Sequence, residues 1–366
     1  MSKLARHALT YFATAGILAL LTGGVMLFTL VDEYNNNRRI DVPHAAATLL
    51  AFAMGQTLLF SGIVAYVSTR RGYVPPLMPA IPQAKTVALI PAYNEEGQVG
   101  AVVKEARKHV DLVIVVDDGS TDNTGKEAEE AGALVIRHGR NMGYGAAVKT
   151  LMLAALAAAA ARAVLLDADG QHDPQEIPLF IQALESGADI VIGNRFGWSE
   201  VPAYRKAGIY VIRAVLRLLG VKVSDPENGY RAFTRKALEL LVKELNETWM
   251  GISSQTVYIA AKKKIKMAEV PTRITYSPGT SSERPLVHGL SIIWTIVWTW
   301  LTDNPIKTFV LGVFFLVISV ALLSYVAVLF NATRYIRLTY TTLGVLSETI
   351  AALLIAVATA SATSSA

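Results

Sequence analysis

The sequence predicts a membrane-anchored α/β protein, in which a mostly parallel β-sheet lies between two α-helical transmembrane hairpins. The 366-residue chain is 52% hydrophobic and only 17% charged, and the excess of apolar residues is concentrated in long uncharged stretches near both ends. Between these stretches, short runs of Val, Ile and Leu alternate with segments of helical pattern. Such alternation is typical of a parallel sheet that helices cover on both faces.

The first predicted unit is a transmembrane hairpin over residues 1–72. Residues 8–31 and 45–69 carry no charged side chain, and each stretch exceeds the roughly 20 residues that cross a bilayer. A cleaved signal peptide is the alternative for the first stretch. The apolar core of the first stretch is too long for a signal peptide, and a second apolar stretch follows at once. An anchor is therefore expected.

A second hairpin is predicted over residues 308–366. Residues 308–333 carry no charge, and a weaker span over residues 338–360 is interrupted by Glu348. An acid within a span is a functional candidate, unless the helix simply begins after it. Together the two hairpins predict an integral membrane protein with about four transmembrane helices.

Two connecting segments separate the hairpins from the sheet. Residues 73–84 contain four prolines and predict a stiff linker. Residues 283–307 are mostly apolar and include Trp294, Trp298 and Trp300. Because tryptophan favours the membrane interface, we expect a helix that lies on the bilayer surface; a buried helix is the alternative.

Basic residues near the first hairpin predict its orientation. Four flank its outer ends and two lie in its connecting loop: Lys3, Arg6, Arg70 and Arg71 against Arg38 and Arg39. Since cytoplasmic segments carry the excess of Lys and Arg, the ends of the hairpin and the domain that follows are expected in the cytoplasm. Arg334 and Arg337, in the other connecting loop, run against this rule. In a prokaryote the membrane would be the plasma membrane.

The central domain is predicted over residues 85–282. Its strands are expected at the runs TVALIPAY, LVIVVDD, ALVIRH, AVLLDAD and DIVIGNR, and its helices at about 96–109, 122–131, 144–162, 174–186 and 202–219. Four of the five runs end in polar residues. Ligands of parallel sheets bind at the carboxyl ends of the strands, so these ends predict one site.

The segment VLLDADGQHDP, residues 164–174, carries the clearest chemical signal. In an extended strand, side chains two positions apart share a face, so Asp167, Asp169 and Gln171 would point the same way. Two carboxylates about 6–7 Å apart repel each other unless a cation lies between them. Oxygen ligands suit Mg²⁺ or Mn²⁺. The alternative is strand-end punctuation, with Asp173 capping a helix at Pro174, and it leaves the other three residues unexplained.

Composition excludes several classes of site. The chain has no cysteine and no HExxH sequence, so disulfides and the common zinc sites are not expected. Neither a Walker sequence nor the GxGxxG fingerprint of dinucleotide-binding proteins follows the first strand. The net charge of +5 comes without a long basic block, so no nucleic-acid partner is expected.

Seven motifs then carry a family resemblance: VALIPAYNEE, VVDDGSTDNT, NMGYGAA, DADGQH, IGNR, DPENGYRAF and AEVPTRITY. In order and spacing they resemble family 2 inverting glycosyltransferases, and within them the dolichyl-phosphate mannose synthase group, which transfers sugars to polyprenyl phosphates. The resemblance implies a GT-A catalytic domain over residues 85–282.

The resemblance also implies roles for individual residues. The nucleotide-sugar site would comprise Pro91, Tyr93, Glu95, Asp118, Asp167, Ala168, Asp169 and Arg195, with the first four at the base and ribose. Asp167, Asp169 and Gln171 would hold Mg²⁺ or Mn²⁺ against the diphosphate. Arg195 would contact the reacting phosphates, and Arg205 the acceptor phosphate. Asp169 and Arg195 are the expected catalytic residues.

The expected activity is transfer of a hexose from GDP-mannose or a UDP-sugar to dolichyl or polyprenyl phosphate, on the cytoplasmic face of the bilayer. The family often has Glu where Gln255 stands, and a phosphate acceptor, already anionic near neutral pH, needs no protein base. The first alternative is a sugar-hydroxyl or glycolipid acceptor; polysaccharide synthases of that kind carry QxxRW, which is absent here. A nucleotide-sensing scaffold or lipid transporter is the alternative of another class.

Overall fold

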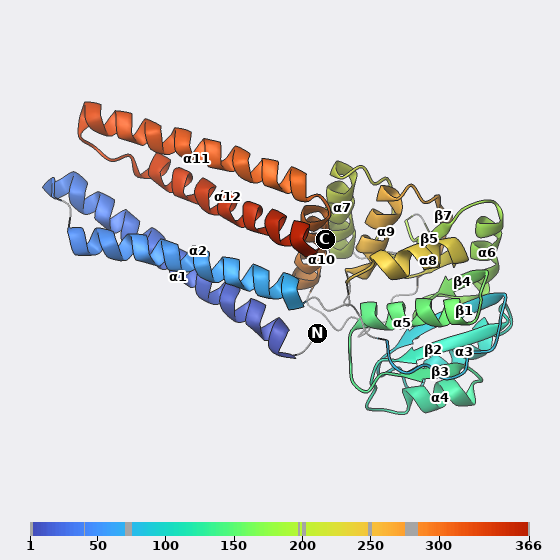
Figure 1. Cartoon of the computed structure of the whole chain (residues 1–366). Helices are drawn as coiled ribbons and strands as arrows, with labels where there is room; N and C mark the ends of the chain where they lie inside the picture. Colours follow the sequence, from blue (N-terminus) through green and yellow to red (C-terminus); the bar gives the residue numbers. More distant parts are fainter. Residues whose placement is uncertain are drawn as a thin grey trace. The chain divides into compact units, whose positions relative to one another are not determined.

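The computed structural model describes the backbone of residues 3–39, 41–69, 75–196, 198–199, 203–247, 251–274 and 285–364. The chain divides into two compact units, residues 72–297 and the remainder at both ends. Figure 1 shows the sheet-containing unit and the long helices of the other unit.

The helical unit contains four candidate membrane spans among the described residues. They lie in α1 (Lys3–Asn37), α2 (Val42–Thr69), α11 (Pro305–Thr333) and α12 (Leu338–Ser364). α1 lies beside α2 and α11 beside α12. The first pair is close because Gly16 and Gly55 face one another, and a Cβ at Gly16 would come within 3.0 Å of the Gly55 carbonyl oxygen. These four helices are long and apolar enough to cross a membrane, which supports the expected membrane protein.

The last turn of α1 is joined by hydrogen bonds to the loop between α11 and α12. The Asn35 amide donates to the Ile336 carbonyl and accepts from the Ile336 N–H, both at 3.0 Å. The α10 helix (Pro285–Asp303) is not among the candidate spans of the described chain. Its location at the membrane interface stays a prediction.

The other unit is a seven-stranded sheet in the order β3-β2-β1-β4-β6-β5-β7. The strands are β1 (Thr86–Ala92), β2 (Leu112–Asp117), β3 (Leu134–Arg137), β4 (Arg162–Leu165), β5 (Ile190–Asn194), β6 (Arg231–Thr234) and β7 (Met267–Pro271). Only β6 runs antiparallel to its neighbours, β4 and β5, in the described part of the sheet. The mostly parallel sheet is thus confirmed. The β6 and β7 strands were not predicted. Arg231 and Thr234 interrupt the apolar pattern of β6, and Glu269 and Pro271 interrupt that of β7.

Helices cover both faces of this sheet. α3 (Val99–Ala106), α4 (Thr124–Glu130) and α6 (Ile177–Glu185) share one core with the strands, while α5 (Tyr144–Ala157) and α8 (Arg235–Glu244) pack on the opposite side. α9 (Ile252–Lys262) packs against α8, and α7 (Ala203–Leu218) precedes β6. The first four predicted helices are shorter than expected.

The four spans predict that both connecting loops lie on one side of the membrane and the sheet unit on the other. The chain has no native cysteine, so single cysteines at Asn36, Ala332 and Lys126 report their own accessibility. In sealed membrane vesicles, an impermeant maleimide should label the Asn36 and Ala332 variants alike and the Lys126 variant oppositely. Labelling of all three from the same side would contradict the four-span arrangement.

Candidate active site

Asp167 and Asp169 follow the carboxyl end of β4 and are the acids predicted to hold the cation. The chain does not stay extended here as expected, because residues 168–170 form a turn in which Gly170 has a φ of +71°. The Gln171 N–H then donates to the Asp169 carboxylate at 3.0 Å. The turn therefore holds the Asp169 side chain through a backbone N–H. The positions of Asp169 and Gln171 follow from this turn and not from the alternation of a strand. Asp173 accepts from the Gln175 N–H and caps the short helix at Pro174, as predicted.

Asp167 lies among buried polar groups. Its Oδ1 accepts from the Tyr144 hydroxyl at 3.2 Å, and its backbone N–H donates to His172 Nδ1 at 3.0 Å. Because Nδ1 accepts this bond, the His172 proton is assigned to Nε2. Burial lowers the pKa of His172 to about 4, so the ring is neutral at pH 7. The 3.5 Å approach of His172 to the Asp167 carboxylate is therefore not an ion pair.

The carboxyl groups at this edge act on one another. Burial raises the pKa of Asp167 to about 6, and burial together with Asp167 raises the pKa of Asp169. Glu95, after β1, has a pKa of about 7, raised by burial and then by Asp169 and Asp167. The edge therefore favours any cation that relieves the repulsion.

The donor set fits a hard divalent cation that keeps part of its shell for a ligand. Among the described residues, no three acidic or histidine side chains converge to enclose a metal ion. Mg²⁺ is commonly held by one or two carboxylates, with water and substrate phosphates completing its octahedron. The carboxylates of Asp167 and Asp169 match that open arrangement better than a closed cage, and the Gln171 amide stays a predicted third ligand.

The segment after β1 presents the residues expected at the nucleotide base. Pro91 is buried in the strand, whereas 43% of Tyr93 is exposed. Asn94 has a φ of +56° and binds the loop after β2, donating to Ser120 and accepting from Thr121. The exposed Tyr93 thus lies next to a residue, Asn94, that is hydrogen-bonded to the loop after β2 through both its backbone and its side chain.

Asp118 lies in the interior, at 3% exposure. Its oxygens accept from the Met142 and Gly143 N–H groups at 2.9 and 2.8 Å and contact His138 Nδ1 at 2.6 Å. Gly143, with a φ of +99°, precedes α5. These contacts fix the start of α5, and a role of Asp118 at the nucleotide stays a prediction.

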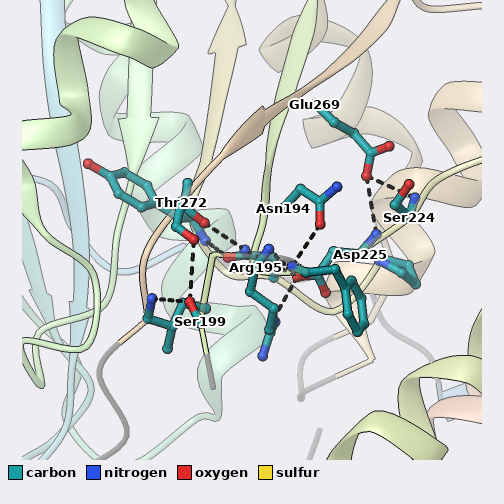
Figure 2. Close-up of polar contacts among 12 residues, drawn as sticks. Asn194, Arg195, Ser199, Ser224, Asp225, Glu269 and Thr272 are labelled. Carbon is teal, nitrogen blue, oxygen red and sulfur yellow. Dashed lines mark hydrogen bonds and ion pairs between the residues drawn. The ribbon is translucent and has the colours of Figure 1, made fainter. Parts of the chain in front are cut away.

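Arg195 supplies positive charge at the end of β5, and 8% of it is exposed. Its Nε donates to Asp225 Oδ2 at 2.6 Å, and its backbone N–H donates to the same oxygen at 3.1 Å (Figure 2). Arg195 is also close enough to lower the pKa of Asp167 in opposition to burial. The structure thus brings Arg195 and the β4 acids to one edge. The side chain of Arg205, in α7, lies outside the described residues.

Two residues of DPENGYRAF belong to this edge although no role was predicted for them. Arg231 is 2% exposed and donates to the carbonyls of Asn228, Ser253 and Pro226. Glu227 accepts from the Ser254 hydroxyl, and burial raises its pKa to about 7. The sequence feature that could have indicated them is the spacing of the charged residues Glu227 and Arg231 around Gly229. Gly229 lies close to the acids, since a Cβ added to it would be 3.0 Å from Asp167 Oδ2.

Comparison with known proteins identifies the family. A family model described as "Glycosyl transferase family 2" matches residues 87–242. The UDP-N-acetylglucosamine–dolichyl-phosphate N-acetylglucosaminyltransferase of Methanococcus voltae is 34% identical over 213 residues, which cover 52% of this chain and 85% of that protein. The chain belongs to glycosyl transferase family 2. It is therefore a glycosyltransferase, and its α/β unit is the GT-A domain of that family.

Two further proteins match over half of the chain or more. The polyprenol monophosphomannose synthase of Mycolicibacterium smegmatis is 32% identical over 53% of this chain and 78% of that protein. A solved structure of Mycobacterium tuberculosis glucosyl-3-phosphoglycerate synthase, with Mg²⁺ and UDP, aligns over 60% of this chain and 78% of that one, at 21% identity and a TM-score of 0.47.

The raised pKa of Glu227 predicts a pH-dependent stability. The folded protein holds this proton up to about pH 7 and the unfolded chain only up to about 4.5, so the stability gained from the neutral acid is lost as the pH rises through 7. Glu227→Gln cannot ionise. Its melting temperature relative to wild type should therefore rise between pH 5 and pH 8, measured on the full chain in detergent.

Glu130→Gln is the matched control, since Glu130 is an exposed carboxylate paired with Lys126 along α4. Its melting temperature relative to wild type should stay constant over the same range. A constant difference for Glu227→Gln as well would contradict the raised pKa.

Proposed function

We propose that this glycosyltransferase moves a hexose from a nucleotide-sugar, GDP-mannose or a UDP-sugar, to the phosphate of a dolichyl or polyprenyl lipid. The observation that carries the proposal is the grouping of opposite charges at one edge of the sheet: Arg195 lowers the pKa of Asp167 against the effect of burial, and Asp167 in turn raises the pKa of Asp169. Acids that favour a cation and an arginine suit a reaction between two phosphate-bearing substrates. The names of the two relatives above agree with this acceptor class.

The donor would bind with its base at Pro91, Tyr93 and Glu95, the exposed Tyr93 ring providing the contact surface. Asp118 would act indirectly, by fixing the start of α5. A divalent cation held by Asp167, Asp169 and Gln171 would neutralise charge on the leaving diphosphate. Ala168, small and buried between the acids, would let the donor approach them.

In the transfer step, an oxygen of the lipid phosphate attacks the anomeric carbon of the donor sugar. The bond from that carbon to the nucleoside diphosphate breaks, and the configuration inverts. Arg195 would stabilise the phosphate charges in this step, with Arg205 at the acceptor phosphate. Since the second pKa of a phosphate monoester is about 6, the nucleophile is already anionic at neutral pH and has no proton to lose.

The side chain at position 255 agrees with a reaction that needs no base there. Gln255 is buried, and its carbonyl oxygen accepts from the Asn246 and Glu247 N–H groups at 3.2 and 2.9 Å. It has a structural role in the segment before α9. Glu227, hydrogen-bonded to Ser254, is then the carboxyl group that a hydroxyl-acceptor reaction could use as its base. A Glu227 variant therefore separates a phosphate acceptor from a hydroxyl acceptor.

We further propose that the reaction takes place on the cytoplasmic face, because the Lys and Arg count favours that side for the ends of the first hairpin. The cysteine reporters described above test this in intact cells. The Asn36 variant should react with an impermeant maleimide added outside, and the Lys126 variant should not.

The cation assignment predicts that Asp169→Asn abolishes turnover. The amide retains the shape but removes one of the two mutually repelling charges, so folding should be preserved while cation affinity falls. Mn²⁺ binding, followed by electron paramagnetic resonance, and transfer activity should be lost together. Asp173→Asn is the control, because asparagine also caps helices. Undiminished wild-type activity in excess chelator would remove the cation from the mechanism.

The acceptor assignment predicts that polyprenyl phosphate is glycosylated and the free polyprenol is not. Membranes containing the protein are incubated with each lipid and a panel of GDP- and UDP-sugars, and the lipids are analysed by mass spectrometry. With the phosphate acceptor, the rate should fall below about pH 6. Glu227→Gln should keep kcat within a few-fold, since no base is required.

Arg195→Ala in the same assay should lower kcat by about 10²-fold or more, as removal of a group that stabilises transition-state charge does. A comparable rate with the free alcohol, together with inactivation by Glu227→Gln, would assign the chain to the hydroxyl-acceptor class.

A further inference from the structure

We propose that Glu269, an exposed residue of the edge strand β7, is a positioning residue for Arg195 and acts through the loop that carries Asp225. The proposal rests on the proposed function only in placing Arg195 at the reacting phosphates. Figure 2 shows the residues of this network.

The network begins with Asp225, which is completely buried. One of its oxygens, Oδ2, receives both the Nε–H and the backbone N–H of Arg195, at 2.6 and 3.1 Å. A guanidinium group is planar and its N–H bonds point in fixed directions. Fixing Nε therefore restricts the plane in which the whole group can lie, and Asp225 determines where Arg195 directs its charge.

The position of Asp225 depends in turn on Glu269. The Ser224 and Asp225 N–H groups both donate to Glu269 Oε1, at 2.8 and 3.2 Å. No helix or strand includes these two residues, so the carboxylate takes the place of a regular backbone partner. Glu269 thus holds the backbone of the residue whose side chain holds Arg195.

Glu269 is itself fixed to the strand that ends at Arg195. In the parallel pairing of β5 with β7, Ile192 is the partner of Glu269 and Asn194 is the partner of Pro271. The Thr272 N–H continues this ladder by donating to the Asn194 carbonyl at 3.1 Å. The contacts therefore begin and end on β5. β5 pairs with β7, Glu269 on β7 holds the Asp225 backbone, and the Asp225 side chain holds Arg195 at the end of β5.

A second observation indicates that Asp225 is placed for Arg195. Its other oxygen, Oδ1, is buried and has no hydrogen-bond partner in the described part of the chain. A buried polar atom left without a partner destabilises the fold. If Asp225 served only to stabilise its loop, an arrangement with both oxygens satisfied would be favoured. The surrounding contacts instead hold the carboxylate in the orientation that fixes Arg195.

The test uses the full-length protein in lipid nanodiscs, with the best nucleotide-sugar and acceptor found for the wild type. Glu269→Ala removes the acceptor of both N–H groups and should lower kcat about 10- to 100-fold, the scale expected when a charged group is misplaced by about 1 Å. The KM for the nucleotide-sugar should change less than about threefold. Glu269→Gln should restore most of kcat, because its amide oxygen accepts the same two hydrogen bonds.

Two comparisons separate positioning from general stabilisation. Glu239→Ala removes an exposed carboxylate that pairs with Arg235 along α8 and should leave kcat unchanged. In the Arg195→Ala background, Glu269→Ala should cause no further loss of kcat, because a residue that acts through Arg195 has nothing left to position.

The same fold-loss in the Arg195→Ala background, or a Glu269→Gln variant as impaired as Glu269→Ala, would overturn the proposal. Unchanged kcat in Glu269→Ala would do so as well. Failure of the proposed function is visible separately, in the wild type: if it transfers only to a hydroxyl acceptor, the same variants are compared with that acceptor.

Discussion

Repulsion among carboxyl groups at the carboxyl edge of the sheet is the constraint around which the site is built. Glu95 follows β1, and Asp167 and Asp169 follow β4. Asp167 raises the pKa of Asp169, and both of them raise the pKa of Glu95. A protein keeps such an arrangement when something compensates for it. Here Arg195 and Arg231 supply opposite charge from inside the fold, and the open side of the edge suits a cation and a charged substrate.

The compensating arginines are held in different ways. Arg231 is surrounded by backbone carbonyls, which satisfy its donors without neutralising its charge. Its field therefore still reaches Asp167 and Glu227. Arg195 instead pairs with a carboxylate, and its backbone is bound to the same oxygen. One arginine thus acts as a fixed source of charge, and the other is oriented toward the place where substrate phosphates are proposed to lie.

The loops around the site are fixed by short side chains bonded to backbone groups. Asn94 and Glu127 link the segment after β1 to the segment after β2, while Asp118 links β2 to the start of α5. These bonds leave little freedom for the residues that face a donor. Such preorganisation is what a transfer between two anions needs, because the cost of ordering charged groups is then met during folding.

The sequence by itself determined the two hairpins, the parallel sheet and most of the acidic edge. Uncharged stretches and Val, Ile and Leu runs report directly on burial, since each residue's preference for an apolar environment is local. The resemblance in seven motifs added the family. The roles of Asp118, Glu227, Arg231 and Glu269 depended on contacts between segments far apart in the chain. In VVDD, nothing local distinguishes an acid that faces a ligand from one that receives three contacts inside the fold.

The tertiary structure also decided the geometry of the clearest motif. Strand alternation predicted one face for Asp167, Asp169 and Gln171, but Gly170 turns the chain, and the acids are brought together by the turn and by the strands beside it. β6 escaped prediction for a related reason. Its arginine is buried only because carbonyl groups from two other segments satisfy it, and a pattern of residue types along one strand cannot show partners that folding brings from elsewhere.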